Sequence, residues 1–572
     1  MIVMNKRFAT TDLLFIAERT RKMSEGSSKR QVLLTPCPRN GPIPFRPIRS
    51  VVQHRVRSFV SQHAFDGVQE IASKMNGPAL GDDHHPLGRW LGRTLFNENF
   101  TAMTIKQIYT GCIAHAAYYL ESNGEAAIFD PLREVQPYID RATADGATIK
   151  YVFETHFHAD FVSGHLDLAA KTGATIVYGP TAKPGFEAHV ATDGEVFNVG
   201  KAKVKVIHTP GHTMESTTYL LIDEQGEEHG IITGDTLFIG DVGRPDLAQH
   251  VIADLTEDKL AGHLFDSLRN KIMPLSDDLI VYPNHGAGSA CGKNMSKETT
   301  DTLGHQKQVN YALDPKLTKE EFKKVLLAGL VPPPGYFPKN VLMNIQGYES
   351  LDKVLERGKR ALNANEFEVV ANEERPLVLD TRPAGEFAQG FIPNSVSIGL
   401  DSNFAMWVGE LIPDIKQTIL LVTEPGKEEE SIVRLSRVGY DNAIGYLDGG
   451  FAAWKAAGKE VDTVQRINAA EFAQRYTSKP LIFDVRKQSE FDSEHVVDAI
   501  NVPLNRINEH LAQFPKDKPF ILHCAGGYRS MIAASILKQR GWDNFVDVEG
   551  GFNAIKETPV ARTEYVCPST ML

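Results

Sequence analysis

The sequence predicts an α/β protein of several domains, and three observations lead to that prediction. Its 572 residues are enough for three or four domains of about 100–200 residues each. From Met103 onward, short runs rich in β-branched and aromatic residues alternate with stretches of helical spacing, which is typical of sheets covered by helices. In the last third of the chain a pattern occurs twice, and this predicts two copies of one small α/β domain.

Composition and charge exclude several classes of protein. The apolar fraction of 42% and the charged fraction of 23% are ordinary for a globular chain. A net charge of −11 disfavours a nucleic-acid partner, and no apolar run is long enough to predict a membrane span. The five cysteines are scattered and odd in number, so they form no disulfide framework and fit a reducing compartment. We therefore expect a cytoplasmic protein.

Residues 1–102 differ in composition from the rest of the chain. They hold 15 Lys and Arg against 8 Asp and Glu, and their apolar periodicity is weak. A basic N-terminal segment can be a targeting peptide, a disordered extension or upstream sequence added by a wrong start codon. Because the first clear strand begins beside Met103, we expect these residues to be a disordered extension.

The region from residue 103 to residue 345 is predicted to be rich in strands. The expected strands are 105–109, 114–121, 126–129, 149–153, 174–178, 196–199, 203–207, 217–222 and 230–233. A helix is expected to open at Asp130 and run through Ala144, and another to begin after Ser163. A further helix is expected at 318–328, and a Pro-rich linker at 331–338 would close the domain.

Several of these strands end in side chains that bind metals. The run F-E-T-H-F-H-A-D-F-V-S-G-H follows the strand at 149–153, and later strand ends carry further ligand types. The residues concerned are His156, His158, Asp160, His212, Asp235 and His285. Histidine is the commonest metal ligand, and two histidines at i and i+2 on extended backbone point the same way. The pattern therefore predicts a metal site at one edge of a sheet.

This region resembles the metallo-β-lactamase fold through four short motifs. They are T-H-x-H-x-D, T-P-G-H, G-D and Y-P-x-H, in that order along the chain. The resemblance implies an αββα sandwich, with the metal at one edge of its two sheets.

One departure from the family pattern is informative. Hydrolases of this superfamily mostly carry a histidine directly after the Asp of the first motif, where this chain has Phe161. A second metal site would lose that imidazole, so a dinuclear zinc hydrolase is disfavoured. Two histidines and one carboxylate with open positions suit non-haem Fe(II). The resemblance to persulfide dioxygenases implies His156, His212 and Asp235 as ligands of a mononuclear iron.

An alternative ligand set remains open, namely one zinc ion held by His156, His158 and His212. In the iron interpretation, His158, Asp160 and His285 would instead orient the ligands or a bound water. Two further residues are candidates for substrate contact. Arg244, in a G-R-x-D segment like that of persulfide dioxygenases, would either bind a substrate carboxylate or pair with Asp246. Cys291 would either carry sulfur near the iron or be a small buried thiol.

The internal repeat resembles rhodaneses. Its two copies share D-x-R after a buried strand and a G-G-F close, and they cover residues 365–460 and 464–560. In the second copy, a buried strand ends at Cys524, and a Gly-rich loop containing Arg529 leads into a helix. Such a loop presents N–H groups and a favourable dipole to an anion, so we expect Cys524 to be a thiolate nucleophile that carries sulfane sulfur. Only four residues separate Cys524 from Arg529, one fewer than in tyrosine phosphatases.

The first copy has no comparable chemistry. Thr423 occupies the cysteine position, and the acidic residues Glu428, Glu429 and Glu430 follow the loop. A site with no thiol and several carboxylates should neither react with sulfur nor attract anions. We therefore expect an inactive domain, and its retention suggests a role in assembly, so we expect a homo-oligomer.

The whole order of domains resembles the three-domain (CstB-like) fusions of a persulfide dioxygenase, a pseudo-rhodanese and a rhodanese. The resemblance implies oxidation of low-molecular-weight thiol persulfides by O2 to sulfite, with sulfur transfer to or from thiosulfate. The carrier would be glutathione, coenzyme A or bacillithiol. Two other hypotheses remain: a zinc hydrolase of thioesters or lactones similar to glyoxalase II, and a non-enzymatic sulfur carrier.

Overall fold

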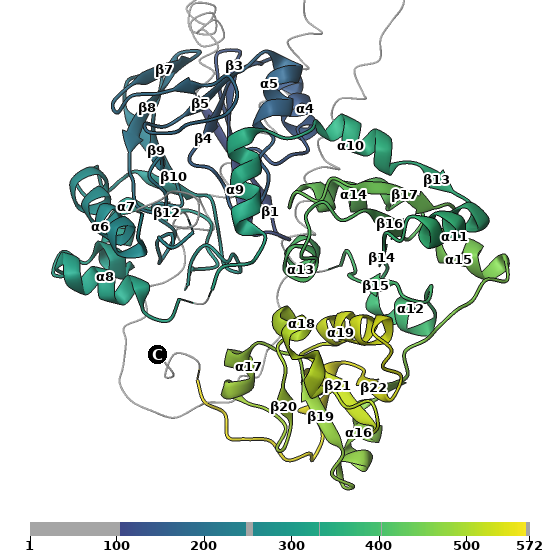
Figure 1. Ribbon diagram of the computed structural model, residues 1–572. Helices are drawn as coiled ribbons and strands as arrows, with labels where there is room; N and C mark the ends of the chain where they lie inside the picture. Colours follow the sequence, from purple (N-terminus) through teal and green to yellow (C-terminus); the bar gives the residue numbers. More distant parts are fainter. Residues whose placement is uncertain (1–102, 248–254, 294, 331, 402, 568–572) are drawn as a thin grey trace, which may run out of the picture. The chain divides into compact units, whose positions relative to one another are not determined.

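The computed structural model describes residues 103–247, 255–293, 295–330, 332–401 and 403–567. The predicted basic extension, residues 1–102, lies outside these described residues. The described part contains two six-stranded sheets followed by two five-stranded sheets (Figure 1). None of its helices has the length and hydrophobicity needed to span a bilayer.

The first two sheets form a sandwich. The first has the order β1-β2-β3-β4-β5-β6 and the second the order β12-β11-β10-β9-β8-β7. The first sheet comprises β1 (Thr104–Thr110), β2 (His115–Ser122), β3 (Glu125–Phe129), β4 (Thr148–Glu154), β5 (Thr175–Tyr178) and β6 (His189–Val190). The second comprises β7 (Val196–Val199), β8 (Ala202–His208), β9 (Thr217–Ile222), β10 (Glu228–Gly234), β11 (Ile280–Pro283) and β12 (Asp301–Thr302).

Three apolar clusters define four layers. Inward-facing residues of both sheets, such as Phe153 and Tyr219, pack against one another between the sheets. The outer face of the first sheet is covered by α4 (Gln136–Ala144) and α5 (His165–Thr172). The outer face of the second is covered by α6 (Glu257–Ser267), α7 (Leu303–Val309) and α8 (Lys319–Leu327). The layers are therefore helix, sheet, sheet and helix, which confirms the αββα sandwich.

The remaining two sheets are all-parallel and have the same topology. The first, in the order β13-β17-β16-β14-β15, comprises β13 (Ala361–Leu362), β14 (Leu377–Asp380), β15 (Val396–Ser397), β16 (Ile419–Val422) and β17 (Ala443–Leu447). The second, in the order β18-β22-β21-β19-β20, comprises β18 (Arg466–Ile467), β19 (Leu481–Asp484), β20 (Ile500–Asn501), β21 (Phe520–His523) and β22 (Phe545–Val548). The predicted repeat is thus one α/β domain present twice.

Helices alternate with these strands. The first copy has α11 (Ala364–Glu373), α12 (Ala384–Gln389), α13 (Phe404–Leu411), α14 (Glu428–Ser436) and α15 (Gly450–Ala456). The second has α16 (Ala469–Tyr476), α17 (Gln488–Ser493), α18 (Ile507–His510), α19 (Tyr528–Gln539) and α20 (Gly551–Ile555).

The connection between the sandwich and the first copy is more than a linker. It contains α9 (Phe337–Gln346) and α10 (Leu351–Gly358). Tyr336 and Phe337, which the sequence assigns to a Pro-rich linker, are each 2% exposed and belong to a large apolar core. The sequence pattern missed this because the prolines of the segment mask the burial of its two aromatic rings.

The helix predicted from Asp130 to Ala144 begins later, at Gln136. Asp130 instead lies at the end of β3 with a positive φ of 49°, a backbone conformation that non-glycine residues rarely adopt. Its carboxylate accepts a hydrogen bond from the Thr155 backbone N–H at 2.7 Å. The Asp-Pro pair therefore ends a strand and directs a carboxylate inward, rather than capping a helix.

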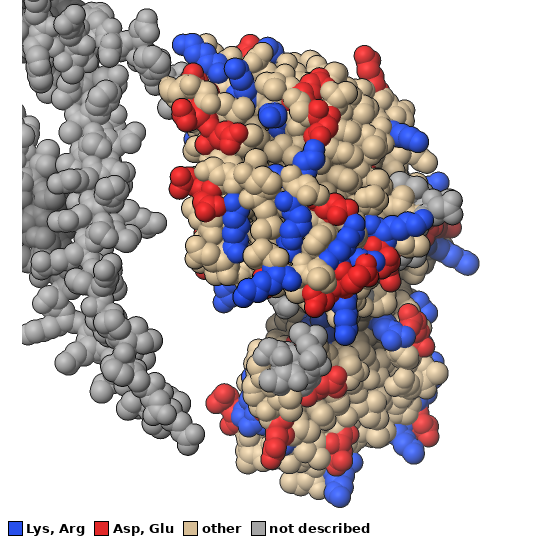
Figure 2. Space-filling view, turned by 90° about the vertical axis from the view of Figure 1, so that its left-hand side faces the viewer, with Lys and Arg blue, Asp and Glu red and all other residues tan. Residues whose placement is uncertain are grey.

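Charged residues are mixed over the surface. On the face drawn in Figure 2, Lys and Arg side chains are interspersed with Asp and Glu.

Candidate functional sites

Three strand ends of the sandwich bring His156, His212 and Asp235 together. Each side chain is at most 2% exposed, and one ligand atom from each lies within 4.8 Å of the other two. The Nε2 atom of His212 is 3.4 Å from Oδ2 of Asp235, and the two imidazole rings are 4.8 Å apart. The loops after β4, β8 and β10 thus supply one compact group of two imidazoles and a carboxylate.

Neighbouring groups orient this cluster for a cation. Thr155 Oγ1 lies 3.0 Å from Nδ1 of His156, and the Arg244 carbonyl lies 2.7 Å from Nδ1 of His212. Each Nδ1 is therefore engaged by an oxygen, which leaves Nε2 of both rings for a metal. Both carboxylate oxygens of Asp235 are buried without a hydrogen-bond partner. Because an unpaired buried carboxylate is costly, the donor set fits a bound cation.

Burial also sets the protonation of His156. It lowers the pKa of His156 well below its ordinary value, and the nearby His158 and His212 add to this effect. The ring is therefore neutral near pH 7 and offers a lone pair. A neutral imidazole is the form that binds metals.

A second group lies beside the first and contains Asp160, His285 and Cys291. Nε2 of His285 is 3.6 Å from Oδ2 of Asp160 and 3.5 Å from Oδ1 of Asp235. Cys291 is only 1% exposed, and burial, with Asp160 and Asp235 nearby, raises its pKa well above the ordinary value. Cys291 is thus a neutral buried thiol close to the candidate metal ligands.

His158 belongs to a third group, with Asp130 and Glu154. Its Nε2 atom lies 2.9 Å from Oδ1 of Asp130 and 3.4 Å from Oε2 of Glu154. Although burial lowers the pKa of His158, the two carboxylates raise it well above the ordinary value. The His158 ring lies 4.2 Å from that of His156, but its Nε2 atom is engaged by two carboxylates, which does not favour the alternative set of three histidines.

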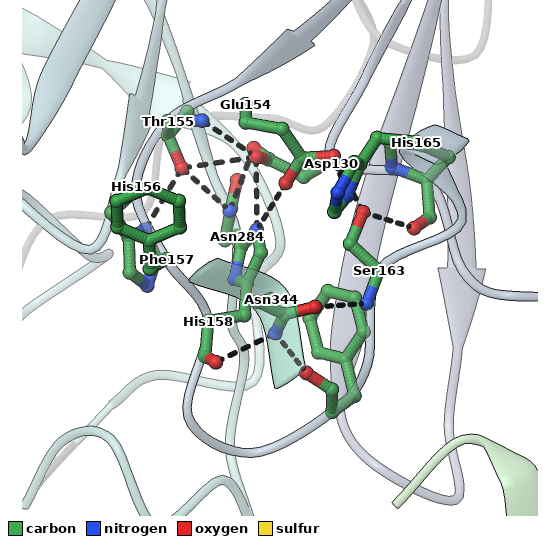
Figure 3. A network of polar contacts seen from close by, with 12 residues as sticks. Asp130, Glu154, Thr155, His156, Phe157, His158, Ser163, His165, Asn284 and Asn344 are labelled. Carbon is green, nitrogen blue, oxygen red and sulfur yellow. Dashed lines mark hydrogen bonds and ion pairs between the residues drawn. The ribbon is translucent and has the colours of Figure 1, made fainter. Parts of the chain in front are cut away.

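Figure 3 shows the polar network that holds the metal-binding loop. The Asp130 carboxylate accepts hydrogen bonds from Thr155 and from Asn284 Nδ2 at 2.8 Å. Asn344, on α9, donates from Nδ2 to the carbonyls of His158 and Phe161, each at 2.8 Å. The loop is thus fixed from both sides, through a helix that follows it by about 180 residues in sequence.

Sequence reasoning missed most of this network. Asp130 and Glu154 each end a buried strand, so the signal that identified Asp235 also identifies them. His115, buried at the start of β2 with Nε2 2.9 Å from the Asp130 carbonyl, had no distinguishing pattern. Asn344 gave no signal, since a helical asparagine is usually exposed.

Phe161 follows Asp160 directly, at the position where hydrolases of this superfamily mostly carry a histidine for a second metal. Its side chain is fully buried, and its ring lies 4.4 Å from that of His158 and 4.3 Å from that of His115. The ring therefore fills the space between two imidazoles with carbon.

Of the two roles considered for Arg244, the structure shows the ion pair. Its Nε and Nη2 atoms each donate to the Asp246 carboxylate at 2.6 Å, and the residue is only 4% exposed. The main-chain carbonyl of the same residue bonds to His212, as described above. Arg244 thus supports a candidate ligand through its backbone while Asp246 holds its side chain.

Cys524 lies at the end of β21, at the N-terminus of the twelve-residue helix α19. The backbone N–H of Gly527 donates to Cys524 Sγ at 3.1 Å, and Gly527 has a φ of 101°. A second loop closes over the first, since the Phe552 N–H bonds to the Cys524 carbonyl at 2.6 Å. The sulfur therefore faces the Gly527 N–H and the N-terminal end of a helix dipole, both of which favour negative charge.

Arg529 is paired rather than free. Its two terminal nitrogens contact the carboxylate of Glu490 on α17, at 2.5 and 2.8 Å. This fork holds the guanidinium beside the loop but offsets part of its charge. No sequence pattern singles out Glu490, which lies 39 residues earlier in the chain.

The first copy repeats the backbone without the chemistry. Thr423 follows β16 as Cys524 follows β21, is 1% exposed, and its hydroxyl has no hydrogen-bond partner. The first turn of α14 carries Glu428, Glu429 and Glu430. The loop therefore has neither a thiol nor a positive field.

Comparison with known families identifies both kinds of domain. The Metallo-beta-lactamase superfamily matches residues 110–285, and the Rhodanese-like domain family matches residues 363–457 and 468–558. A metallo-β-lactamase of known structure from Staphylococcus aureus subsp. aureus COL is 31% identical, with a TM-score of 0.53. The alignment covers 61% of this chain and 99% of that one, so it extends beyond residues 110–285.

Curated relatives match shorter stretches of the chain. A hydroxyacylglutathione hydrolase of Brucella anthropi is 43% identical over 144 residues, which are 24% of this chain and 48% of that protein. A probable hydroxyacylglutathione hydrolase of Schizosaccharomyces pombe is 27% identical over 204 residues, which are 35% of this chain and 74% of that one. The match to the Brucella protein thus spans about half its length. This protein therefore consists, in its described part, of a metallo-β-lactamase domain followed by two rhodanese-like domains.

Proposed function

We propose that this protein oxidises low-molecular-weight thiol persulfides with O2 at a mononuclear non-haem iron, and transfers sulfane sulfur through Cys524. The observation that carries the proposal is the buried group of two histidines and one carboxylate, in a chain where Phe161 stands in place of a further histidine. That donor set with open positions is typical of Fe(II) oxygenases. Cys524, at the N-terminus of a helix in the same chain, would supply the sulfur-transfer chemistry.

In this proposal His156, His212 and Asp235 hold the ion, and Thr155 and the Arg244 carbonyl fix the two rings. Bound iron would supply the one-electron redox chemistry that O2 needs to react with sulfur. The net reaction converts RSSH, O2 and H2O into RSH and sulfurous acid, so that the terminal sulfur loses four electrons and O2 gains four. His285 and Asp160, 3.6 Å apart, are placed to hold a proton beside the reacting sulfur.

The rhodanese step uses a second centre. The Cys524 thiolate attacks the outer sulfur of thiosulfate, the S–S bond of thiosulfate breaks, and sulfite leaves with the bonding electrons. The N–H groups of the loop and Arg529 stabilise the charges on both anions. The reverse reaction, from a Cys524 persulfide and sulfite to thiosulfate, uses the same contacts.

A second candidate is a zinc hydrolase of glutathione thioesters. The names of the curated relatives favour it. So does the group of Asp160, His285 and Cys291, which offers ligands for a second ion despite Phe161. Metal stoichiometry separates the two, because this hydrolase would hold two zinc ions and the dioxygenase one iron.

The test is O2 consumption by the full chain, purified anaerobically, loaded with Fe(II) and given glutathione persulfide or coenzyme A persulfide. We expect uptake that requires iron and yields sulfite, and thiosulfate when excess persulfide is present. The matched controls are zinc-loaded protein and an Asp235→Asn variant, in which uptake should be lost. No uptake with either persulfide, together with two bound zinc ions and hydrolysis of S-lactoylglutathione, would overturn the proposal in favour of the hydrolase.

A further inference from the structure

We infer that the first rhodanese-like domain forms the outer wall of the substrate pocket of the metal centre, and that Met406 on α13 sets the width of that pocket. The pocket and its wall are inferred from the positions of the residues that line it. The identity of the molecule that enters rests on the proposed function above.

A narrow cavity reaches the candidate metal centre at Asp160, a member of the second ligand group, which is one of its lining residues. Its free volume is about 10 Å³, which is room for a single water-sized molecule. The lining is Ile113, Asp160, Ser289, Ala290, Tyr336, Phe337 and Met406. Six of these residues precede the rhodanese-like repeat, and Met406 belongs to the repeat's first copy.

The packing of α13 fixes Met406 in this position. Gly409 lies one turn after Met406 and on the same side of the helix. A Cβ atom added at Gly409 would lie 2.3 Å from the Tyr336 ring, which itself lines the cavity. The glycine thus lets α13 approach the ring closely, and this contact brings Met406 to the cavity.

The same apolar core runs through both domains. Phe404, Ala405, Trp407, Val408 and Leu411 of α13 belong to one cluster with Tyr336, Phe337, Phe161 and Cys291. An interface with a continuous apolar core is typical of permanent association. The likeness to the Staphylococcus aureus structure, which extends past the metallo-β-lactamase part, fits such a joint unit.

Polar contacts tie this domain to the metal-binding loop as well. The Arg437 carbonyl at the end of α14 accepts a hydrogen bond from the Val162 N–H at 2.7 Å. Arg133, whose side chain is fully buried, donates to the Ser436 carbonyl at 3.1 Å and pairs with Asp441 at 2.5 Å. The wall therefore keeps a fixed position relative to the loop that carries His156 and His158.

The lining also indicates what the pocket admits. Among its residues, Asp160 is the one carboxylate, and the rest are apolar, aromatic or a serine. A channel this narrow admits nothing wider than a slender, uncharged arm that ends in sulfur, and carboxylates or phosphates of a larger carrier would stay outside. Methionine suits this place, because its thioether is flexible and makes favourable contacts with sulfur and with aromatic rings.

The test changes the size of residue 406 and measures access to the bound ion. Met406→Trp should slow, and Met406→Ala accelerate, the removal of bound metal by 1,10-phenanthroline, each several-fold. Met406→Leu, of similar volume, should match the wild type. The control is Val369→Ala, since Val369 is 52% exposed on α11 of the same domain. Sulfurtransferase activity at Cys524 reports that each variant is folded.

Turnover gives a second readout. Met406→Trp should raise the KM for a thiol persulfide about tenfold with little change in kcat, because the change lies at the entrance and not at the reacting atoms. Unchanged chelation rates in both Met406→Trp and Met406→Ala would overturn the inference. If Met406→Trp fails to fold, Met406→Ala alone decides. Removal of the metal by a chelator does not depend on the reaction. If the wild-type protein consumed no O2, the proposed function would be refuted and this inference would still stand.

Discussion

The two rhodanese-like domains have the same framework and differ at one loop. Both have the same strand order, and both carry a buried Asp-Arg pair at the end of the second strand of the copy, β14 or β19. Arg382 bonds to Asp380 at 2.5 Å and Arg486 to Asp484 at 2.6 Å. Each guanidinium also stacks on a phenylalanine, Phe451 in the first copy and Phe552 in the second, at 4.2 and 3.9 Å.

The loops after β16 and β21 differ in their chemistry. The second copy has a thiol and an Arg529–Glu490 fork at its loop, and the first has a hydroxyl and three glutamates. The comparison teaches that the contacts that build this fold and those that perform its reaction reside in different residues. A copy without the reaction can therefore keep its stability and serve another purpose, such as the pocket wall inferred above.

The largest expected effect is that of Cys524→Ser, which removes the nucleophile. Thiosulfate sulfurtransferase activity should fall by about 10³-fold or more, because a hydroxyl cannot carry sulfane sulfur under these conditions. Persulfide-dependent O2 uptake should remain. The matched control in the other copy, Thr423→Ala, should leave both activities unchanged. Equal loss of both activities in Cys524→Ser would contradict a protein with two separate centres.

Breaking the shared pair should affect both copies alike. Asp380→Ala and Asp484→Ala each leave a nearly buried arginine without its partner, which costs about 3–5 kcal/mol. Urea unfolding of the full chain, followed by fluorescence, would measure this loss. Asp448→Ala, at an exposed site of the first copy, serves as the control. If only one of the two variants lost this much free energy of unfolding, the Asp-Arg pair would not have the same structural role in both copies.

A pH dependence should distinguish the copies. Burial raises the pKa of Asp547 on β22 to about 6, whereas the register of the first copy places Tyr446 at the same point. A carboxyl whose pKa is higher in the folded state than its unfolded value near 3.9 stabilises the fold at low pH. That stability, roughly 1–3 kcal/mol, is lost as the pH rises from about 4 to 6.

Asp547→Asn should therefore flatten the pH dependence of unfolding of the second copy between those values. Thermal unfolding at several pH values is the measurement, and Tyr446→Phe is the control. A wild-type stability that rises with pH over this interval, and falls in no part of it, would contradict the assignment.

Substitutions of Arg529 and of Glu490 should change the KM for thiosulfate in opposite directions. Arg529→Ala should raise the KM for thiosulfate about tenfold, since a charge-assisted contact to an anion is lost. Glu490→Gln should lower that KM, because it removes the charge that offsets Arg529. Arg506→Ala, 58% exposed in the same domain, is the control. Steady-state kinetics would refute this role if both variants shifted KM the same way.

The smallest expected effect is that of restoring a thiol to the first copy. Thr423→Cys in the Cys524→Ser background should regain under about 1% of the sulfurtransferase activity, because the glutamates of α14 oppose an anion. Recovery well above that level would mean that the cysteine alone separates the two loops. Alkylation of the new cysteine by iodoacetamide would show whether it is accessible.

Much of this organisation could be predicted from the sequence. The repeat, the position of Cys524 and the strand-end residues His156, His212 and Asp235 are local patterns, and local patterns depend on spacing along the chain. The helix predicted at Asp130 was wrong, because a strand end and a helix start look alike when Asp precedes Pro.

What the sequence by itself determined was therefore the kinds of domain and the chemical groups at their strand ends. The tertiary structure decided which groups meet: Asn344 holds a carbonyl 186 residues away, and the Arg437 carbonyl holds Val162 in another domain. It also decided that Met406, an unremarked residue on an apolar helix, lines the same cavity as Asp160. The physical reason is that these contacts depend on how elements pack in space, and residues far apart in sequence carry no local pattern that records their packing.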